Sequence, residues 1–383
     1  MKTRFDLVTI LSTIILSSLC GNHCKAATLI ALPAGIAVRS IDEWDSNRLI
    51  SATTNDGLTE LQYEQERQTA TFSTNDLCKN PQVAIENNNT NTHEILSFGR
   101  FCDKEAQSVS FGFLSDTQGD QEIHKIMASS TVEILSSVTD LNFIVHGGDH
   151  VDSGTKSNWM QYYKIATNSY SGAFPMVPVI GNHEYYFDST LSQRNFIYRA
   201  NENTPEYIAI NRGIVTLIVL NSNILDLSEE DIITQNLWLE NTLEKNSFEK
   251  KTIIVAMHHA PFSSGISMVL RPYTAEYIRS HWVPLFEKYG VKLVLSGHEH
   301  LYERLFKDNV NYIVSGPSGG NFYPQGVVSE YSRFIKNHVS TLCFFRVSQN
   351  GSISLLTYGL VEDKALSQQE RAARIEIIDQ AVF

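Results

Sequence analysis

Five short motifs of metal-ligand residue types occur in order along this 383-residue chain. They are Asp116-Thr117-Gln118, Gly148-Asp149-His150, Gly181-Asn182-His183-Glu184, Met257-His258-His259 and Gly297-His298-Glu299-His300. Carboxylates, amide oxygens and imidazoles together suit borderline divalent metals such as Zn, Mn or Fe, whereas Ca and Mg prefer oxygen ligands alone. The motifs therefore predict a metal site.

The ordered set of motifs carries this prediction, because each motif alone is a weak signal. A single His-x-His is as often a polar turn as a pair of ligands. Each of the five, however, follows a strand-like apolar run, and we expect these runs to be strands of one sheet. Ligands of an open α/β sheet bind outside the carboxyl ends of its strands, so the motifs are expected to meet in space.

The number of candidate ligands exceeds what one metal ion needs. The seven are Asp116, Gln118, Asp149, Asn182, His298, His300 and one of His258 and His259. Such a set fits two divalent ions that share a bridging carboxylate. Two ions so placed can generate a hydroxide at neutral pH and stabilise both the attacking and the leaving oxygen of an in-line displacement. The predicted chemistry is hydrolysis of a phosphoester.

Apolar runs and helical patterns alternate from Ser108 onward and predict an α/β sandwich over residues 106–361. The expected strands are Val109–Leu114, Leu141–Val145, Val177–Ile180, Val215–Leu220, Ile253–Met257, Val291–Leu295 and Tyr312–Val314. Apolar residues recur at helical spacing within Glu122–Ser136 and Gln235–Leu243, which predicts two helices.

The two ends of the chain differ from this central part. Residues 27–105 contain short alternating segments and predict a small β-rich domain. Residues 362–383 predict a C-terminal helix, because Ser367-Gln368-Gln369-Glu370 has the spacing of a capping box and apolar residues follow.

Residues 1–26 are typical of a signal peptide, with Lys2 and Arg4 ahead of a short apolar stretch. We therefore expect a secreted or periplasmic protein without a membrane span. In an oxidising compartment Cys78 and Cys102 could form a disulfide, while Cys343 lies in an apolar run; three free thiols are the alternative.

The chain has a formal charge of −12, which becomes −14 without residues 1–26 because that segment holds Lys2, Arg4 and Lys25 but only Asp6 as an acid. A nucleic-acid duplex needs a broad basic face and is an unlikely partner by this criterion. An anionic small substrate remains compatible, because bound divalent cations would dominate the local field. The sequence does not indicate an oligomeric state.

The five motifs resemble those of the calcineurin-like metallophosphoesterase superfamily, and the run from Gly297 to Arg304 is similar to its purple-acid-phosphatase-like branch. The resemblance implies a four-layer αββα sandwich and a small phosphorylated substrate. It implies that Asp116, Gln118, Asp149 and His300 hold one metal. Asp149, Asn182, His298 and His258 or His259 would hold the other, with Asp149 as the bridge.

The resemblance also implies that His183 contacts the phosphate and protonates the leaving group. We prefer His258 over His259 as the ligand because it directly follows the apolar strand, although Pro261 favours His259. His259, Tyr302 and Arg304 are candidate contacts to the substrate.

Two positions depart from the family pattern. Gln118 stands where the superfamily usually has His or the purple enzymes have Gly, and its amide oxygen is a weaker, neutral ligand. Asp152 stands where purple enzymes carry a tyrosine ligand. We therefore expect a colourless enzyme that uses Mn, Zn or ferrous iron.

The favoured function is an exported phosphatase that hydrolyses phosphate monoesters by attack of a metal-bound hydroxide. A phosphodiesterase or nucleotide pyrophosphohydrolase is the alternative within the superfamily. A catalytically inert binding or adhesion scaffold is the alternative of another class.

Overall fold

The computed structural model describes residues 107–138, 141–189, 205–361 and 374–383, together with the backbone of seven strands between Ala27 and Ser97. The predicted signal peptide and the Cys78–Cys102 pair lie outside the described residues. Cys343 is buried with a free thiol, as its apolar surroundings suggested.

The first sheet has ten strands in the order β20-β19-β18-β8-β9-β10-β1-β2-β5-β4. Its central strands β8 (Ser108–Leu114), β9 (Leu141–His146) and β10 (Met176–Pro178) run parallel. On one side they continue into β18 (Val339–Ser348), β19 (Ile353–Val361) and β20 (Ile375–Val382). On the other side they continue into β1 (Ala27–Leu32), β2 (Gly35–Ser40), β5 (Thr69–Ser73) and β4 (Gln62–Glu64).

The second sheet has seven strands in the order β11-β12-β13-β14-β16-β15-β17. Their bounds are Ile208–Arg212, Val215–Val219, Thr252–Ala256, Leu293–Ser296, Val310–Ser315, Tyr302–Lys307 and Ser332–Lys336, in that order. A separate three-stranded sheet contains β3 (Ile50–Thr53), β6 (Gln82–Asn87) and β7 (Thr92–Ser97). The N-terminal region is thus rich in strands, as predicted, and four of its strands extend the first sheet.

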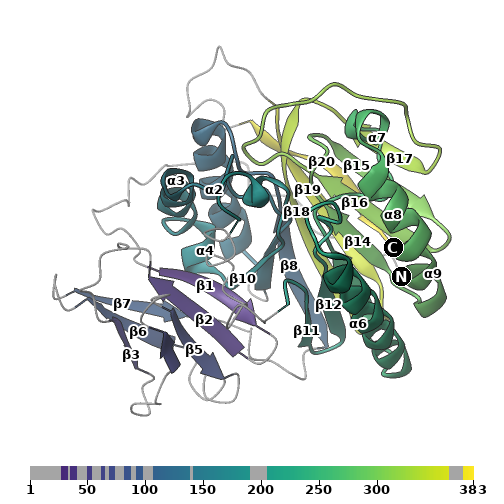
Figure 1. Cartoon of the computed structure of the whole chain (residues 1–383). Helices are drawn as coiled ribbons and strands as arrows, with labels where there is room; N and C mark the ends of the chain where they lie inside the picture. Colours follow the sequence, from purple (N-terminus) through teal and green to yellow (C-terminus); the bar gives the residue numbers. More distant parts are fainter. Residues whose placement is uncertain are drawn as a thin grey trace, which may run out of the picture.

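Helices cover the outer face of each large sheet (Figure 1). The helices beside the first sheet are α2 (Gln121–Ser136), α3 (Lys156–Ala166) and α4 (Tyr170–Ala173). Those beside the second are α6 (Glu229–Phe248), α7 (Ser267–Leu270), α8 (Tyr273–His281) and α9 (Val283–Tyr289). This arrangement confirms the predicted αββα sandwich, and α2 and α6 confirm the two helices expected from periodicity.

The side-chain alternation of strands β12 and β13 divides the core into two clusters. Leu217 and Ile254 belong to the cluster shared with the first sheet, whereas Ile218 and Val255 belong to the cluster formed with the outer helices. Because successive residues of a strand face opposite sides, these strands are apolar throughout. The second sheet is therefore buried on both faces along these strands.

The end of the chain is a strand, so the predicted C-terminal helix was wrong. Residues 375–382 form β20, which pairs antiparallel with β19. The apolar residues Ile375, Ile378 and Val382 have a spacing that suits a helix, yet the segment is rich in β-branched residues that favour a strand. Pairing with β20 also satisfies backbone groups that β19 would otherwise expose at a sheet edge. The capping box at Ser367 lies outside the described residues.

Asp379 of β20 explains why two predicted substrate contacts were wrong. The Tyr302 hydroxyl donates to Asp379 Oδ2 at 2.8 Å, and Arg304 Nε donates to the same oxygen at 2.8 Å. Tyr302 is fully buried, so its phenol cannot reach a substrate. Both side chains instead attach the last strand to the second sheet.

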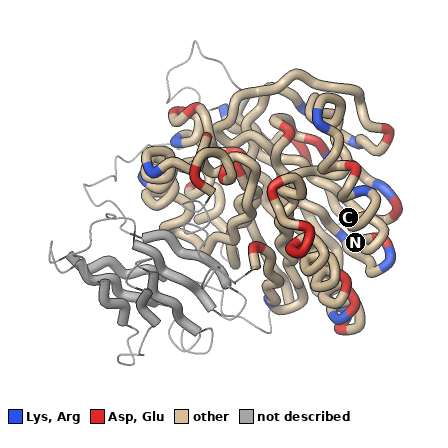
Figure 2. Tube along the Cα trace, in the orientation of Figure 1, with Lys and Arg blue, Asp and Glu red and all other residues tan. Residues whose placement is uncertain are grey.

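Charged residues of both signs are interspersed along the part of the chain that the structure describes (Figure 2). In the view of Figure 2, Lys and Arg of the described residues are scattered along the trace among acidic residues. Among the helices that the structure describes, none is both long enough and apolar enough to cross a membrane.

We predict that Asp379→Ala lowers the free energy of unfolding by about 2 kcal/mol, because charge-assisted hydrogen bonds from Arg304 and Tyr302 are lost. Urea denaturation measures this change. Glu376→Ala, an exposed position of the same strand, should change it by less than about 0.5 kcal/mol. If Asp379→Ala instead raised the KM for a phosphate ester and left the stability unchanged, Arg304 and Tyr302 would be substrate contacts after all.

Candidate active site

The five motifs meet where the two large sheets face one another. Asp116 and Asp149 follow β8 and β9 of the first sheet, whereas His258 and His298 follow β13 and β14 of the second. The His298 backbone N–H donates to Asp116 Oδ1 at 3.0 Å, across 182 positions of sequence. The convergence was predicted correctly, but the expectation that all five strands belong to one sheet was wrong.

Three of the motif residues have a left-handed backbone, with φ of 54° at Asp116, 52° at Asp149 and 66° at His298. Such angles are unfavourable for residues with a Cβ and are typical of functional sites, where surrounding contacts enforce them. Here the Asp116 N–H donates to the Gly148 carbonyl at 3.0 Å, which links the first two motifs through their backbones.

Gly148 allows this close approach. It has a φ of 102°, and a Cβ at this position would lie 2.6 Å from His258 Nδ1. A side chain would therefore displace the imidazole, so the glycine beside the second motif is required by space as well as by its backbone angle.

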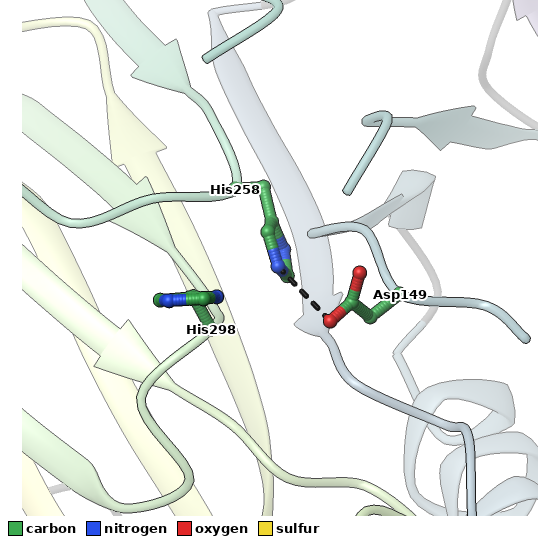
Figure 3. Close-up of side chains that lie close together, drawn as sticks. All are labelled: Asp149, His258 and His298. Carbon is green, nitrogen blue, oxygen red and sulfur yellow. Dashed lines mark ion pairs between the residues drawn. The ribbon is translucent and has the colours of Figure 1, made fainter. Parts of the chain in front are cut away.

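The most compact cluster consists of Asp149, His258 and His298, whose ligand atoms lie within 4.8 Å of one another (Figure 3). His258 Nε2 lies 3.1 Å from Asp149 Oδ2. His258 Nδ1 lies 2.9 Å from the Gly147 carbonyl, a contact that turns Nε2 toward the carboxylate. Asn182 Oδ1 completes the group at 3.1 Å from His258 Nε2 and 3.0 Å from His298 Nδ1.

The electrostatics of the cluster centre on the pair Asp149 and His258. Burial opposes a charge on both groups, but the adjacent Asp149 carboxylate raises the pKa of His258 to about 10. His258 in turn outweighs burial and lowers the pKa of Asp149 below its usual range. Burial and the neighbouring His258 lower the pKa of His298 to about 3. The site therefore holds a charged pair next to a neutral imidazole.

Asp116, Gln118 and His300 form the second part of the site. His300 Nε2 lies 3.4 Å from Asp116 Oδ1, and Gln118 Nε2 lies 3.2 Å from Asp149 Oδ2. His300 Nδ1 contacts the Asn321 carbonyl, and the ring stacks on Tyr323 at 4.0 Å. Burial and the Asp116 and Asp149 carboxylates raise the pKa of Tyr323 to about 12, so its phenol stays neutral.

The Gln118 amide indicates whether the residues of this part of the site fit a cation. Its Oε1 atom is buried and has no hydrogen-bond partner, whereas Nε2 faces Asp149 and His300. Rotation of the amide by half a turn exchanges the positions of these two atoms. The oxygen would then join the carboxylates and imidazole in facing one point, so the donor set fits a divalent cation.

His183 lies beside this cluster and is more accessible. Its side chain is 23% exposed, compared with 0% for His258, and Nε2 lies 3.8 Å from Asp149 Oδ2. Its backbone N–H donates to Asp149 Oδ1 at 2.9 Å, and its Nδ1 lies 2.8 Å from the Asp152 carbonyl. The Nδ1 contact leaves Nε2 on the side of the Asp149 carboxylate.

His259 is held differently from its neighbour His258. Its Nδ1 lies 2.9 Å from the Ser222 hydroxyl, and its ring lies 4.3 Å from the His298 ring. Burial and His298 hold the pKa of His259 well below its usual value. His258, and not His259, is the member of the pair that contacts Asp149.

Glu184 binds the backbone of two motif loops, a role that its sequence position alone did not predict. Its buried carboxylate accepts hydrogen bonds from the backbone N–H groups of Gly181 at 2.7 Å, Asp149 at 3.0 Å and His150 at 2.7 Å. Its place as the last residue of the third motif was the only available signal. Glu184 joins the loop that carries Asp149 to the loop that carries Asn182.

His146 makes a second connection between motif loops. Its Nδ1 accepts from the Gly148 N–H at 3.3 Å, and its Nε2 lies 3.1 Å from the Thr117 hydroxyl. The His150 ring stacks on it at 3.7 Å, so His150 is buried behind the site.

Comparisons with known proteins agree with this geometry. The model of the calcineurin-like phosphoesterase family matches residues 109–302, about half of the chain. The chain is 25% identical over 233 residues to phosphoenolpyruvate phosphatase of Allium cepa, covering 57% of this chain and 46% of the relative. It is 31% identical over 156 residues to purple acid phosphatase of Glycine max, covering 37% of this chain and 32% of the relative.

The fold is similar to that of a purple acid phosphatase from yellow lupin (Lupinus luteus) seeds, with a TM-score of 0.66 and 13% identity. That match covers 93% of this chain and 73% of the lupin chain. The chain spans less than half the length of either curated relative. Together these matches confirm the resemblance that the motifs indicated.

We predict that metal binding releases a proton from His258. Its raised pKa of about 10 keeps the imidazole protonated at pH 7, and a metal binds only the deprotonated ring. The affinity for Mn²⁺ should therefore increase as pH rises from 6 toward 9. Calorimetric titration in two buffers of different ionisation enthalpy measures the released protons.

His281→Gln, at an exposed position on α8, is the matched control and should leave proton release unchanged. His258→Gln should bind Mn²⁺ more weakly and release fewer protons. Equal proton release by the parent and His258→Gln would contradict the prediction.

Proposed function

Because the chain belongs to the calcineurin-like phosphoesterase family, we propose that it hydrolyses small phosphate monoesters with the help of two divalent cations. The observation that carries this proposal is the buried convergence of Asp149, His258 and His298, with Asn182 Oδ1 beside both imidazoles. The names of the relatives from Allium cepa and Glycine max support a phosphate ester as substrate.

The residues assigned to the cations follow the two halves of the site. Asp116, Gln118, Asp149 and His300 would hold one ion, and Asp149, Asn182, His258 and His298 would hold the other. Mn, Zn and ferrous iron all suit this mixture of oxygen and nitrogen ligands. Bound there, two cations supply a water of lowered pKa and stabilise charge on the phosphate oxygens.

His183 is the residue that we assign to the leaving group. Its Nδ1 is held by the Asp152 carbonyl, so its Nε2 is the atom that can give a proton to the departing alkoxide. The His183 side chain is partly exposed, so a substrate can reach it. The His258 side chain is buried and its Nε2 contacts Asp149. Hydrogen bonding of its backbone N–H to Asp149 keeps the acid at a fixed distance from the bridging carboxylate.

A monoester is favoured over a diester or a nucleotide pyrophosphate because the run from Gly297 to Arg304 is similar to the purple-acid-phosphatase-like branch.

Export is the second part of the proposal. It rests on Lys2, Arg4 and the apolar stretch that follows them, which together are typical of a signal peptide. The enzyme would then act in the periplasm or outside the cell.

We predict that the purified protein contains close to two divalent metals per chain and hydrolyses p-nitrophenyl phosphate faster than bis(p-nitrophenyl) phosphate. Elemental analysis and absorbance at the nitrophenolate band measure the two quantities. Faster turnover of the diester would favour a phosphodiesterase. Fewer than one metal per chain, with no turnover after addition of Mn²⁺ or Zn²⁺, would identify an inert scaffold.

His183→Asn should lower kcat by about 100-fold for an alkyl phosphate, whose leaving group needs a proton. The loss should be smaller for p-nitrophenyl phosphate, because nitrophenolate leaves without protonation. His281→Asn is the matched control, since that imidazole is exposed on α8. Equal losses for both esters would argue against His183 as the acid.

The enzyme is expected to be colourless. Asp152 stands at the position where purple enzymes have a tyrosine ligand, so this position supplies no phenolate for a charge-transfer band with ferric iron. The visible absorption spectrum of the metal-loaded protein tests this, and a band that produces a purple colour would contradict it.

A further inference from the structure

Tyr186 closes the short turn that carries two residues of the proposed site. A single 3₁₀ turn, η2 (His183–Tyr185), follows Asn182, and the Tyr186 N–H donates to the His183 carbonyl at 3.2 Å. Side chains three positions apart eclipse one another in a 3₁₀ turn. The Tyr186 ring accordingly packs on the His183 ring, with centroids 4.8 Å apart.

The hydroxyl of the same tyrosine contacts the other residue. Asn182 Nδ2 donates to Tyr186 Oη at 2.8 Å, while Asn182 Oδ1 faces His258 and His298. The amide therefore has its nitrogen on the phenol and its oxygen on the side of the metal cluster. The opposite orientation would aim N–H donors at a bound cation.

The backbone of Tyr186 is itself anchored. Its carbonyl accepts from the Gly154 N–H at 2.9 Å, which connects the turn to the loop after Asp149. The next residue, Phe187, is 90% exposed, whereas Tyr186 is 40% exposed. Of these two neighbouring aromatic residues, Tyr186 is the one turned toward the site.

We propose that Tyr186 is a positioning residue for both Asn182 and His183. Its hydroxyl keeps the Asn182 amide oxygen directed at the metal cluster, and its ring holds the His183 imidazole at the leaving-group side. The inference rests on the proposed function, because it takes Asn182 as a ligand and His183 as the acid. Tyr186 would thus orient both the metal ligand Asn182 and the proton donor His183.

The two contacts use different parts of the side chain, so two variants separate them. Tyr186→Phe removes the hydroxyl and keeps the ring, whereas Tyr186→Leu removes both. Tyr273→Phe and Tyr273→Leu are matched controls, since Tyr273 is 69% exposed at the start of α8. Thermal denaturation without metal verifies that all four variants remain folded.

The experiment measures Mn²⁺ affinity by calorimetry and kcat for p-nitrophenyl phosphate and an alkyl phosphate at saturating Mn²⁺. Tyr186→Phe should weaken Mn²⁺ binding about tenfold, as is typical when a partner of a metal ligand is removed. Its ratio of alkyl to aryl turnover should equal that of the parent. Tyr186→Leu should show the same loss of affinity, and its alkyl turnover should fall about tenfold further than its aryl turnover.

Unchanged Mn²⁺ affinity in Tyr186→Phe would overturn the role at Asn182. Equal loss of alkyl and aryl turnover in Tyr186→Leu would overturn the role at His183. In both cases the parent would still bind metal and hydrolyse the esters, so the proposed function would stand. A parent protein that neither binds Mn²⁺ nor turns over either ester would overturn the proposed function and this inference together.

Discussion

The buried carboxylate of Asp149 is the constraint on which the site depends. A charge removed from water is stable only when donors surround it. Here the His183 N–H, His258 Nε2 and Gln118 Nε2 lie within 2.9 to 3.2 Å of its two oxygens. These groups come from three separate motifs, so stabilising one carboxylate brings the motifs together. The same crowding of ligand atoms creates the place for a cation.

Backbone contacts make this arrangement rigid. The Glu184 carboxylate accepts hydrogen bonds from backbone N–H groups in the loops of Asp149 and Asn182. The His146 ring contacts both Thr117 and Gly148 and so links their loops. Charge-assisted bonds to a buried carboxylate are stronger than bonds between neutral groups. They offset the cost of the left-handed backbone at the ligand positions. The protein fold itself therefore holds the candidate ligands in place.

The sequence predicted the site better than it predicted the contacts around it. Strand-end motifs are local signals, and Asp116, Asp149 and His298 meet as their positions indicated. The partner of Arg304 lies 75 positions away on a strand whose apolar spacing also suits a helix, so nothing local to Arg304 pointed to Asp379. The sequence did not predict that the strands divide between two sheets, for a related reason. Periodicity reports which faces of a strand are buried but does not report which strand is its neighbour.

The two departures from the family pattern have different physical weights. Gln118 stands where the superfamily usually has His, and both side chains are neutral when they bind a metal, so this exchange leaves the charge of the site unchanged. Asp152 replaces a phenol with an exposed carboxylate. His183, however, uses the backbone carbonyl of residue 152, which every amino acid provides. The side chain at this position can therefore vary without moving the His183 imidazole. The expected colour of the enzyme and the role proposed for His183 thus depend on different atoms of residue 152.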